Sequence, residues 1–272
     1  GIPTAKYETF DDPEKVMDYI KAEGKYPVVI KADGLALGKG VLICQNEQEA
    51  ADGVKEIMLD KKFGASGNHV VVEEFLTGPE VSVLSFCDGK TVKPMVSSMD
   101  HKRALDHDEG LNTGGMGTVA PNPYYTPAVA ERCMQEIFLP TVAAMQAEGC
   151  PFKGCLYFGL MLTPDGPKVI EYNCRFGDPE TQVVLPLLES DLLTVMEATT
   201  NGTLDKTDVK FSDGAAACVI LASGGYPLAY EKGKEITGLT AGQLDAADVT
   251  VYHAGTAIKD GRLVTNGGAC WA

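Results

Sequence analysis

The strongest fold signal in the sequence lies in Val169-Ile-Glu-Tyr-Asn-Cys-Arg-Phe-Gly-Asp-Pro-Glu180. Lys168 to Ile170 opens an apolar run that predicts a strand. In a strand, alternate residues share a face, so Glu171 and Asn173 are expected to point the same way. Carboxylate and amide oxygens are ligands that Mg²⁺ prefers, and this ion keeps substrate phosphates in its remaining positions. The strand end is therefore predicted to be a magnesium site.

A cation and two carboxylates follow this predicted metal site. They are Arg175, Asp178 and Glu180. One interpretation is that they face a charged substrate beside the metal. The alternative is a structural ion-pair cluster, with Arg175 held by Asp178 or Glu180.

Composition limits the class of protein. The 272 residues are 44% hydrophobic, which supports one large or two ordinary folded domains. A net charge of −15 argues against a nucleic-acid partner, which would need a basic contact surface. Mg²⁺ and a local basic cluster could still hold a nucleotide.

Cysteine usage and the two termini add further expectations. The eight cysteines form no CxxC pair, so we expect reduced thiols in a cytoplasmic protein. No apolar run is long enough for a membrane span, and no signal peptide is evident, so no membrane partner is expected. The chain opens on Gly1 without Met and stops soon after Leu263-Val-Thr265. We expect a fragment of a longer polypeptide.

Hydrophobic periodicity predicts an α+β chain with antiparallel hairpins and packed helices. The first helix should begin at an N-cap, Asp11, with Glu14 three residues on, and end near Gly24. Asn46 should cap the second. Ser97 to Pro123 is polar and aperiodic, which predicts a long loop. Two further helices are expected over 127–148 and 190–199, and Pro140 should kink the first of them. Strands are expected over 27–31, 41–44, 70–75, 81–86, 155–162, 168–172, 215–222, 249–251, 255–259 and 262–265.

A glycine-rich loop follows the strand that ends at Lys31. Glycines let a backbone approach phosphates closely, while lysines offset the phosphate charge. The order of residues is neither that of a Walker P-loop nor that of a Rossmann fingerprint. The alternative is a flexible hairpin tip with a solvated lysine. The candidate phosphate-binding residues are Lys31, Gly34, Gly38, Lys39 and Gly40.

Two other segments suggest nucleotide and acceptor binding. The apolar strand that ends in Glu73, Glu74, Phe75 and Leu76 could read a nucleobase through its backbone, and Glu80 could accept from ribose hydroxyls. Solvated glutamates are the alternative.

A second segment is suited to anion binding, because basic residues precede a glycine-rich turn with free backbone N–H groups. The alternative is that this glycine turn only reverses the chain. Its candidate residues are Asp100, His101, Lys102, Asn112, Thr113, Gly114, Gly115, Met116 and Gly117.

These motifs, in this order, resemble the phosphoribosylamine–glycine ligase (glycinamide ribonucleotide synthetase) family of the ATP-grasp superfamily. The resemblance spans Lys31 to Gly40, Glu73 to Leu76, Asp100 to Arg103, Asn112 to Gly117 and Glu171 to Glu180. His253 to Thr256 and Thr265 to Gly268 look like the start of that family's C-terminal domain.

The resemblance implies an ATP-grasp fold, with nucleotide held between two α+β lobes, and a ligase of purine biosynthesis. ATP would phosphorylate glycine, and 5-phosphoribosylamine would attack the acyl phosphate. Glu171 and Asn173 would bind Mg²⁺ or Mn²⁺. Residues 31–40, 73–76 and Glu80 would hold ATP. Arg175, Lys102 and Asp100 would be catalytic, with His101, Asn112 to Gly117, Asp178 and Glu180 on the glycine and acceptor side.

The resemblance also implies boundaries and departures. The small lobe would cover residues 1–70, the large lobe 71–205, and a partial β-rich C-terminal domain 206–272. The family's N-terminal domain, which completes the cleft, is absent. Many ATP-grasp enzymes carry another carboxylate on the strand that matches Leu156 to Leu162, where this chain has none. A nucleotide-binding fragment without turnover, or a ligase with another acceptor, is the rival hypothesis.

Overall fold

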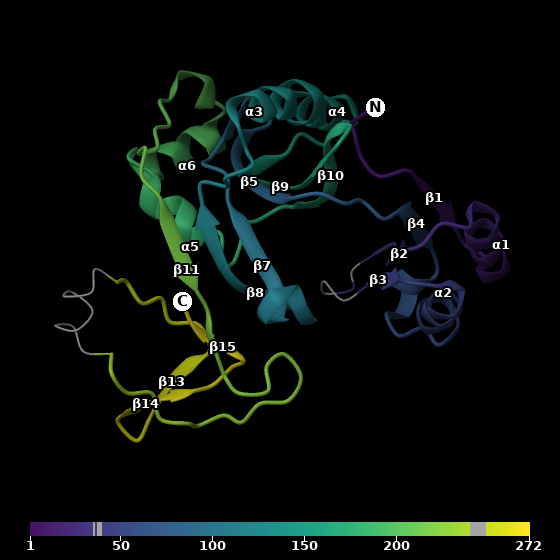
Figure 1. The fold of residues 1–272 in the computed structure, drawn as a ribbon. Helices are drawn as coiled ribbons and strands as arrows, with labels where there is room; N and C mark the ends of the chain where they lie inside the picture. Colours follow the sequence, from purple (N-terminus) through teal and green to yellow (C-terminus); the bar gives the residue numbers. More distant parts are fainter. Residues whose placement is uncertain (35, 37–39, 240–248) are drawn as a thin grey trace. The chain divides into compact units, whose positions relative to one another are not determined.

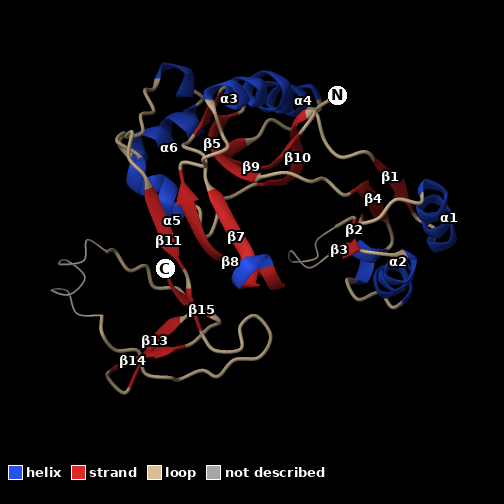
Figure 2. Ribbon diagram, viewed as in Figure 1, coloured by secondary structure: helices blue, strands red, loops and turns tan. Residues whose placement is uncertain are grey.

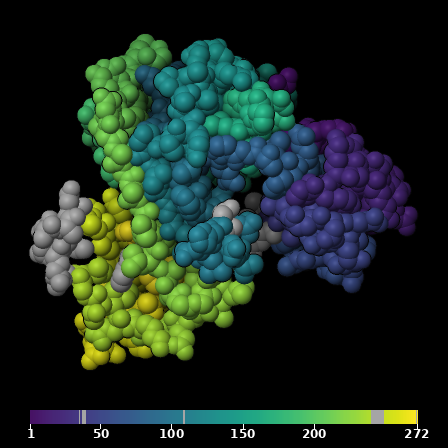
Figure 3. All heavy atoms as spheres, in the orientation of Figure 1, coloured from purple at the N-terminus to yellow at the C-terminus, as the bar shows by residue number. Residues whose placement is uncertain are grey.

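The computed structural model describes residues 1–34, 36, 40–239 and 249–272. The chain divides into two compact units. Unit 1 is formed mainly by Pro3–Gly78 and Thr163–Ile170, and unit 2 by Pro79–Leu162 and Glu171–Ala272. The purple-to-blue atoms of the space-filling view belong mostly to unit 1 (Figure 3).

Unit 1 is built on a four-stranded antiparallel sheet that packs against two helices (Figures 1 and 2). The strand order is β1-β4-β2-β3. The core forms because alternate residues of β2 and β4, such as Ile30 and Val72, point toward Val16 and Ile20 of α1. The elements are β1 (Tyr7–Phe10), α1 (Pro13–Glu23), β2 (Val28–Ala32), β3 (Val41–Cys44), α2 (Glu47–Val54), η1 (Lys55–Leu59), η2 (Gly64–Gly67) and β4 (Val70–Glu74).

Side-chain caps fix the ends of these helices, with one correction to the prediction. The N-cap of α1 is Asp12, not Asp11: the Asp12 carboxylate accepts from the backbone N–H of Glu14 at 2.9 Å. Asp12 directly precedes Pro13, whose fixed φ suits the first helical position. The predicted cap at Asn46 is confirmed, and α1 ends at Gly24 as predicted, where the glycine adopts a left-handed conformation.

A second antiparallel sheet, of order β10-β9-β5-β6, has helices on both faces (Figures 1 and 2). It lies in unit 2, except for the last residue of β9 and residues 166–170 of β10, which are grouped with unit 1. Phe158 of β9 packs against Phe138 from one helical layer, with ring centroids 4.2 Å apart and the rings tilted. Its neighbour Tyr157 points into the opposite core, with Val183 and Val195. The elements are β5 (Glu80–Asp88), β6 (Val92–Pro94), α3 (Pro127–Cys133), η4 (Met134–Phe138), α4 (Leu139–Ala147), β9 (Lys153–Thr163), β10 (Gly166–Asn173), α5 (Thr181–Val184), η5 (Leu185–Leu187), α6 (Leu192–Asn201) and η6 (Leu204–Lys206).

The predicted helix over 127–148 is present, but its middle is a π-helical turn, η4. Pro140 follows this turn at the start of α4. A proline inside a regular helix loses an N–H bond and clashes with the carbonyl four residues earlier. The wider π turn gives that carbonyl room, so the helical run continues.

The predicted long loop from Ser97 to Pro123 is wrong. This segment forms a hairpin of β7 (Met99–Leu105) and β8 (Glu109–Ala120), joined by η3 (Asp106–Asp108). Strand β11 (Ala216–Val219) pairs with the end of β8 to complete a three-stranded sheet. The pairing partner is about a hundred residues away in sequence, so local periodicity did not reveal it.

Short strands follow in the last part of unit 2. They form two two-stranded sheets: β12 (Leu221–Ala222) with β15 (Ala269–Trp271), and β13 (Thr256–Lys259) with β14 (Arg262–Thr265). The strand expected over 249–251 is wrong, because those residues have no ladder partner. All eight cysteines are free, as predicted. No helix within the described ranges is long and apolar enough to cross a membrane.

Candidate active site

Lys31 and Glu73 form an ion pair on the face of the unit 1 sheet that is turned away from its core. Their strand neighbours Ile30 and Val72 point into the core, so pleating turns Lys31 and Glu73 the other way. Lys31 Nζ lies 2.7 Å from Glu73 Oε2, and the two side chains are 20% and 18% exposed. Nζ also donates to the backbone carbonyl of Ile170 at 3.2 Å. An ammonium has three donors, so one N–H remains for a further acceptor.

The glycine-rich loop joins β2 to β3, as predicted. Ala32 donates its backbone N–H to the carbonyl of Gly40 at 2.8 Å, which closes the loop. A Cβ at Gly34 would lie 2.6 Å from Ser66 Oγ, so close packing explains this glycine. The candidate residues Gly38 and Lys39 lie outside the described residues.

The segment proposed to hold the base follows β4. The Glu74 carboxylate accepts from the backbone N–H of Lys6 and from Lys168 Nζ, both at 3.0 Å. These bonds, the Lys6 bond first, hold the pKa of Glu74 below its usual value. Phe75 is 39% exposed and Leu76 is half-buried.

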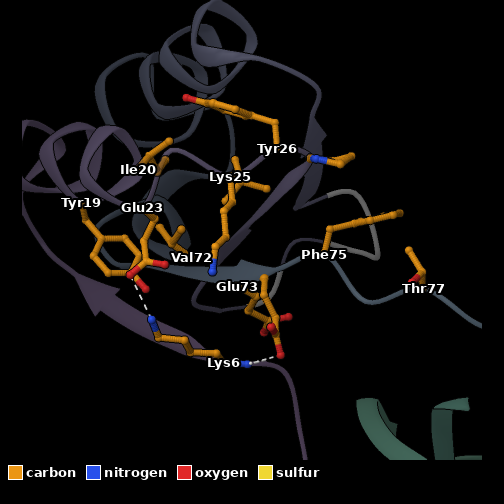
Figure 4. A pocket seen from close by; sticks show the side chains of 13 residues that line it. Lys6, Tyr19, Ile20, Glu23, Lys25, Tyr26, Val72, Glu73, Phe75 and Thr77 are labelled. Atoms are coloured by element: carbon orange, nitrogen blue, oxygen red, sulfur yellow. Dashed lines mark hydrogen bonds and ion pairs between the residues drawn. The ribbon is translucent and has the colours of Figure 1, made fainter. Parts of the chain in front are cut away.

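A pocket of about 390 Å³ opens beside this segment, entirely within unit 1 (Figure 4). Its walls include Ile20 of α1, Val72 of β4 and the ring of Phe75. Across its mouth, Lys6 is paired with Glu23 at 2.9 Å. Val72 of the core face and Glu73, the ion-pair partner of Lys31, both line this pocket.

In unit 2, the fold brings together charged residues that are far apart in the sequence. Lys102 Nζ of β7 lies 3.7 Å from Glu80 Oε2 of β5 and 4.0 Å from Asp100 Oδ2. The Asp100 side chain is only 4% exposed. Burial acts to lower the pKa of Lys102, but the surrounding carboxylates outweigh it and raise the value. These carboxylates are Asp100, Glu80, Glu171 and Glu180.

Glu180 is also a buried member of this cluster. It is 4% exposed, and its Oε1 accepts from the Tyr157 hydroxyl at 2.9 Å. Burial first, and then the charge of Asp100, raise the pKa of Glu180. A buried carboxyl beside another carboxylate and a lysine is typical of functional sites.

The predicted metal ligands lie side by side at the end of β10. Asn173 Nδ2 donates to Glu171 Oε1 at 3.2 Å, which leaves the amide oxygen and the second carboxylate oxygen for another partner. Two protein oxygens suit Mg²⁺, which takes its other ligands from water and phosphates. No group of three or more His, Cys, Asp and Glu side chains in the described ranges could hold a metal by itself. The donor set therefore fits a magnesium ion that a nucleotide helps to bind.

Glu171 has room because its neighbour on β9 is a glycine. A Cβ at Gly159 would lie 2.9 Å from Glu171 Cγ. A side chain at position 159 would therefore displace the carboxylate. The sequence of β9 contains no carboxylate, and at position 159, beside Glu171, the strand has only a glycine.

Arg175 is exposed and donates to the carbonyl of Phe176 at 2.8 Å. In the described part of the chain, no ion pair joins Arg175 to Asp178 or Glu180. The alternative of a structural ion-pair cluster is therefore wrong. Asp178 instead accepts from the Gln182 amide at 2.7 Å.

The predicted glycine turn is part of the β7–β8 hairpin. A Cβ at Gly115 would lie 2.4 Å from Pro179 Cδ, so this glycine lets β8 approach the segment that carries Asp178 and Glu180. Thr113 donates to the carbonyl of Lys102 at 2.8 Å and accepts from the N–H of Gly115. The other candidates lie along the same hairpin. His101 and Asn112 are exposed, and Gly117 is buried opposite His101. The backbone N–H of Gly114 donates to the Tyr226 hydroxyl, and the carbonyl of Met116 accepts from the N–H of Ile220.

Sequence reasoning missed Tyr157 and Ser82, whose side chains contact Glu180 or each other. Both are polar residues within apolar strands, at positions that alternation turns toward the core. A polar residue at a core-facing position is unusual, and this could have marked Ser82 and Tyr157 as candidates.

Comparison with known proteins identifies the family. A model of the phosphoribosylglycinamide synthetase ATP-grasp (A) domain matches residues 1–181, and one of the C domain of the same synthetase matches residues 216–272. The chain belongs to the phosphoribosylglycinamide synthetase family. The family resemblance and the α+β ATP-grasp fold are thereby confirmed.

Sequence relatives match nearly the whole chain. The chain is 50% identical over 269 residues to the trifunctional purine biosynthetic protein adenosine-3 of Gallus gallus, and 49% identical over 268 residues to the phosphoribosylamine–glycine ligase of Vibrio vulnificus. Each alignment covers 98% of this chain, but only 27% and 62% of those relatives.

Solved structures agree with this assignment. Phosphoribosylamine–glycine ligase from Thermotoga maritima superposes with a TM-score of 0.88 at 38% identity, over 100% of this chain and 66% of that one. The biotin carboxylase of Campylobacter jejuni has a TM-score of 0.68 at 18% identity, over 100% and 59% of the two chains. The second likeness shows the fold alone.

Proposed function

We propose that this chain carries the ATP-dependent ligation of glycine to 5-phosphoribosylamine, which gives glycinamide ribonucleotide, ADP and phosphate. The observation that carries the proposal is the cluster of Asp100, Lys102 and Glu180 with the oxygen pair of Glu171 and Asn173, on a chain whose relatives bear the ligase name. ATP and Mg²⁺ or Mn²⁺ would be the cofactors. We also propose the lobe boundaries 1–70, 71–205 and 206–272.

Charge neutralisation is the main demand of the proposed chemistry. Transfer of a phosphoryl group to the glycine carboxylate brings two anions together. The Lys31 ammonium, held by Glu73 and Ile170, would offer its third N–H to a phosphate. Arg175, which has no ion-pair partner among the described contacts, would offer its guanidinium to an anionic substrate group. A metal at Glu171 and Asn173 would neutralise phosphate charge.

The acidic cluster would act on the amine side of the reaction. Glycine and phosphoribosylamine both carry amines, and buried carboxylates favour such groups. Lys102 keeps its proton in this setting, because carboxylates raise its pKa. It would therefore act as a fixed cation and not as a base.

The test is glycine-dependent ADP formation. The complete natural polypeptide that contains this sequence is supplied with ATP, Mg²⁺, glycine and freshly made phosphoribosylamine. The proposal predicts ADP formation that needs both glycine and phosphoribosylamine. ATP binding without glycine-dependent ADP would instead indicate a nucleotide-binding protein, and ADP formation with another amine acceptor would indicate a different ligase.

A further inference from the structure

We propose that Tyr157 is a positioning residue for this site: its hydroxyl fixes the Glu180 carboxylate beside Asp100 and Lys102. The inference rests on the proposed function, because it assigns Tyr157 a role in glycine ligation. Tyr157 would not touch substrate and would act through Glu180.

The geometry is a chain of two buried hydrogen bonds that runs from Ser82 through Tyr157 to Glu180. The Tyr157 hydroxyl lies 2.9 Å from Glu180 Oε1 and 2.6 Å from Ser82 Oγ. Tyr157 and Glu180 are each 4% exposed, and Ser82 is 3% exposed. A tyrosine hydroxyl has one hydrogen. Since the Glu180 oxygen accepts that hydrogen, Tyr157 must accept from the Ser82 hydroxyl.

Three separate elements meet in this chain. Ser82 stands on β5, Tyr157 on the neighbouring strand β9, and Glu180 just before α5. Ser82 also exchanges backbone bonds with Ser98, both at 2.9 Å, immediately before β7. The hydroxyl of Tyr157 therefore ties Glu180 to β5, and the Ser82–Ser98 bonds link β5 to the start of β7, which carries Asp100 and Lys102.

The bond changes the charge that Lys102 experiences. Burial and the Asp100 charge disfavour ionised Glu180, while the Tyr157 hydrogen bond and the Lys102 charge favour it. Glu80 and Glu171 complete the charged groups around Lys102. If Tyr157 lost its hydroxyl, Glu180 would be neutral more of the time and free to rotate, so Lys102 would lose part of its anionic surroundings.

A purely structural role for Tyr157 makes a different prediction. Its ring packs in the core with Val183, Val184 and Leu187. Tyr157→Phe keeps this ring and removes only the hydroxyl. A structural tyrosine would change stability without changing the kinetics toward one substrate.

The experiment compares wild type, Tyr157→Phe and Ser82→Ala in the complete natural polypeptide. Loss of a hydrogen bond to a charged group predicts a fall in kcat/KM for glycine of about tenfold or more in Tyr157→Phe. KM for ATP should stay within about twofold. Ser82→Ala should have a smaller effect in the same direction, because it keeps the bond between Tyr157 and Glu180. The control is Tyr125→Phe, which removes the hydroxyl contact of a partly buried tyrosine of unit 2 with Cys133 and should leave both constants unchanged.

A second readout does not depend on turnover. Carbon-13 NMR of the glutamate carboxyls reports the titration of Glu180, and we expect its pKa to rise further in Tyr157→Phe. An unchanged titration, or wild-type glycine kinetics in Tyr157→Phe, would overturn the inference. If wild type shows no glycine-dependent ADP formation, the proposed function fails, while the NMR titration still decides whether Tyr157 controls Glu180.

Discussion

Substitution of Asp88 tests how much its side-chain hydrogen bonds stabilise unit 2. Asp88 ends β5, is 4% exposed, and accepts three backbone N–H bonds. Oδ1 accepts from Lys90 at 3.0 Å and from Thr91 at 2.7 Å, and Oδ2 accepts from Leu204 at 3.1 Å. One carboxylate thus closes the β5–β6 turn and ties it to η6.

Asp88→Ala should destabilise unit 2 by about 3–5 kcal/mol. Each lost bond costs about 1 kcal/mol net, and an N–H left buried without a partner costs up to about 3 kcal/mol. Asp88→Asn is the matched variant, because an amide oxygen in place of Oδ1 would keep two of the three bonds. We expect it to cost no more than about half as much.

Stability should be measured by urea unfolding, with amide hydrogen exchange at Thr91 and Leu204 to assign the loss to unit 2. A cost below about 1 kcal/mol for Asp88→Ala, or equal costs for both variants, would refute the reasoning. The pH dependence adds a check. Burial acts to raise the pKa of Asp88, but the three N–H bonds outweigh it and lower the value. The contribution should be complete above the unfolded-state pKa of about 3.9 and lost as pH falls through the lower folded value.

Three further substitutions test the site. Glu171→Ala should abolish glycine-dependent ADP formation with little change in the unfolding midpoint; surviving activity would mean that the metal assignment is wrong. Gly159→Ala should weaken Mg²⁺-dependent nucleotide binding at least tenfold, because its Cβ would lie 2.9 Å from Glu171 Cγ, and unaltered binding in a titration with ATP and Mg²⁺ would contradict that crowding. Lys31→Met should weaken ATP binding by about tenfold or more, since a charge-assisted bond to phosphate is lost, while circular dichroism stays unchanged; wild-type affinity would remove Lys31 from the proposed phosphate site.

Local patterns predicted those parts of the site that lie within one strand. Glu171 and Asn173 share a face because a strand has a period of two, and the structure places them in contact. The strand before the glycine loop and the helix ends at Asn46 and Gly24 were also predictable, because each depends on a local pattern of a few residues.

The parts that depend on long-range pairing were not predictable. Residues 99–120 are polar on both faces, so no alternation marked them as a hairpin, and their third strand lies near residue 216. Asp100, Lys102 and Glu180 were each named, but no spacing showed that a buried tyrosine would bond Glu180. Tyr157 lies in an apolar run, where an aromatic residue is ordinarily a core residue.

The lack of a side chain at Gly159 also bears on how this site could change over evolutionary time. Two neighbouring strands, β9 and β10, meet at this point, and the space between them holds the Glu171 side chain. As the two strands are packed here, a Cβ at position 159 would lie 2.9 Å from Glu171 Cγ, so a carboxylate gained on β9 would require the Glu171 side chain to shift. A second acidic ligand on β9 would therefore need a compensating change on β10, and the two strands would have to change together.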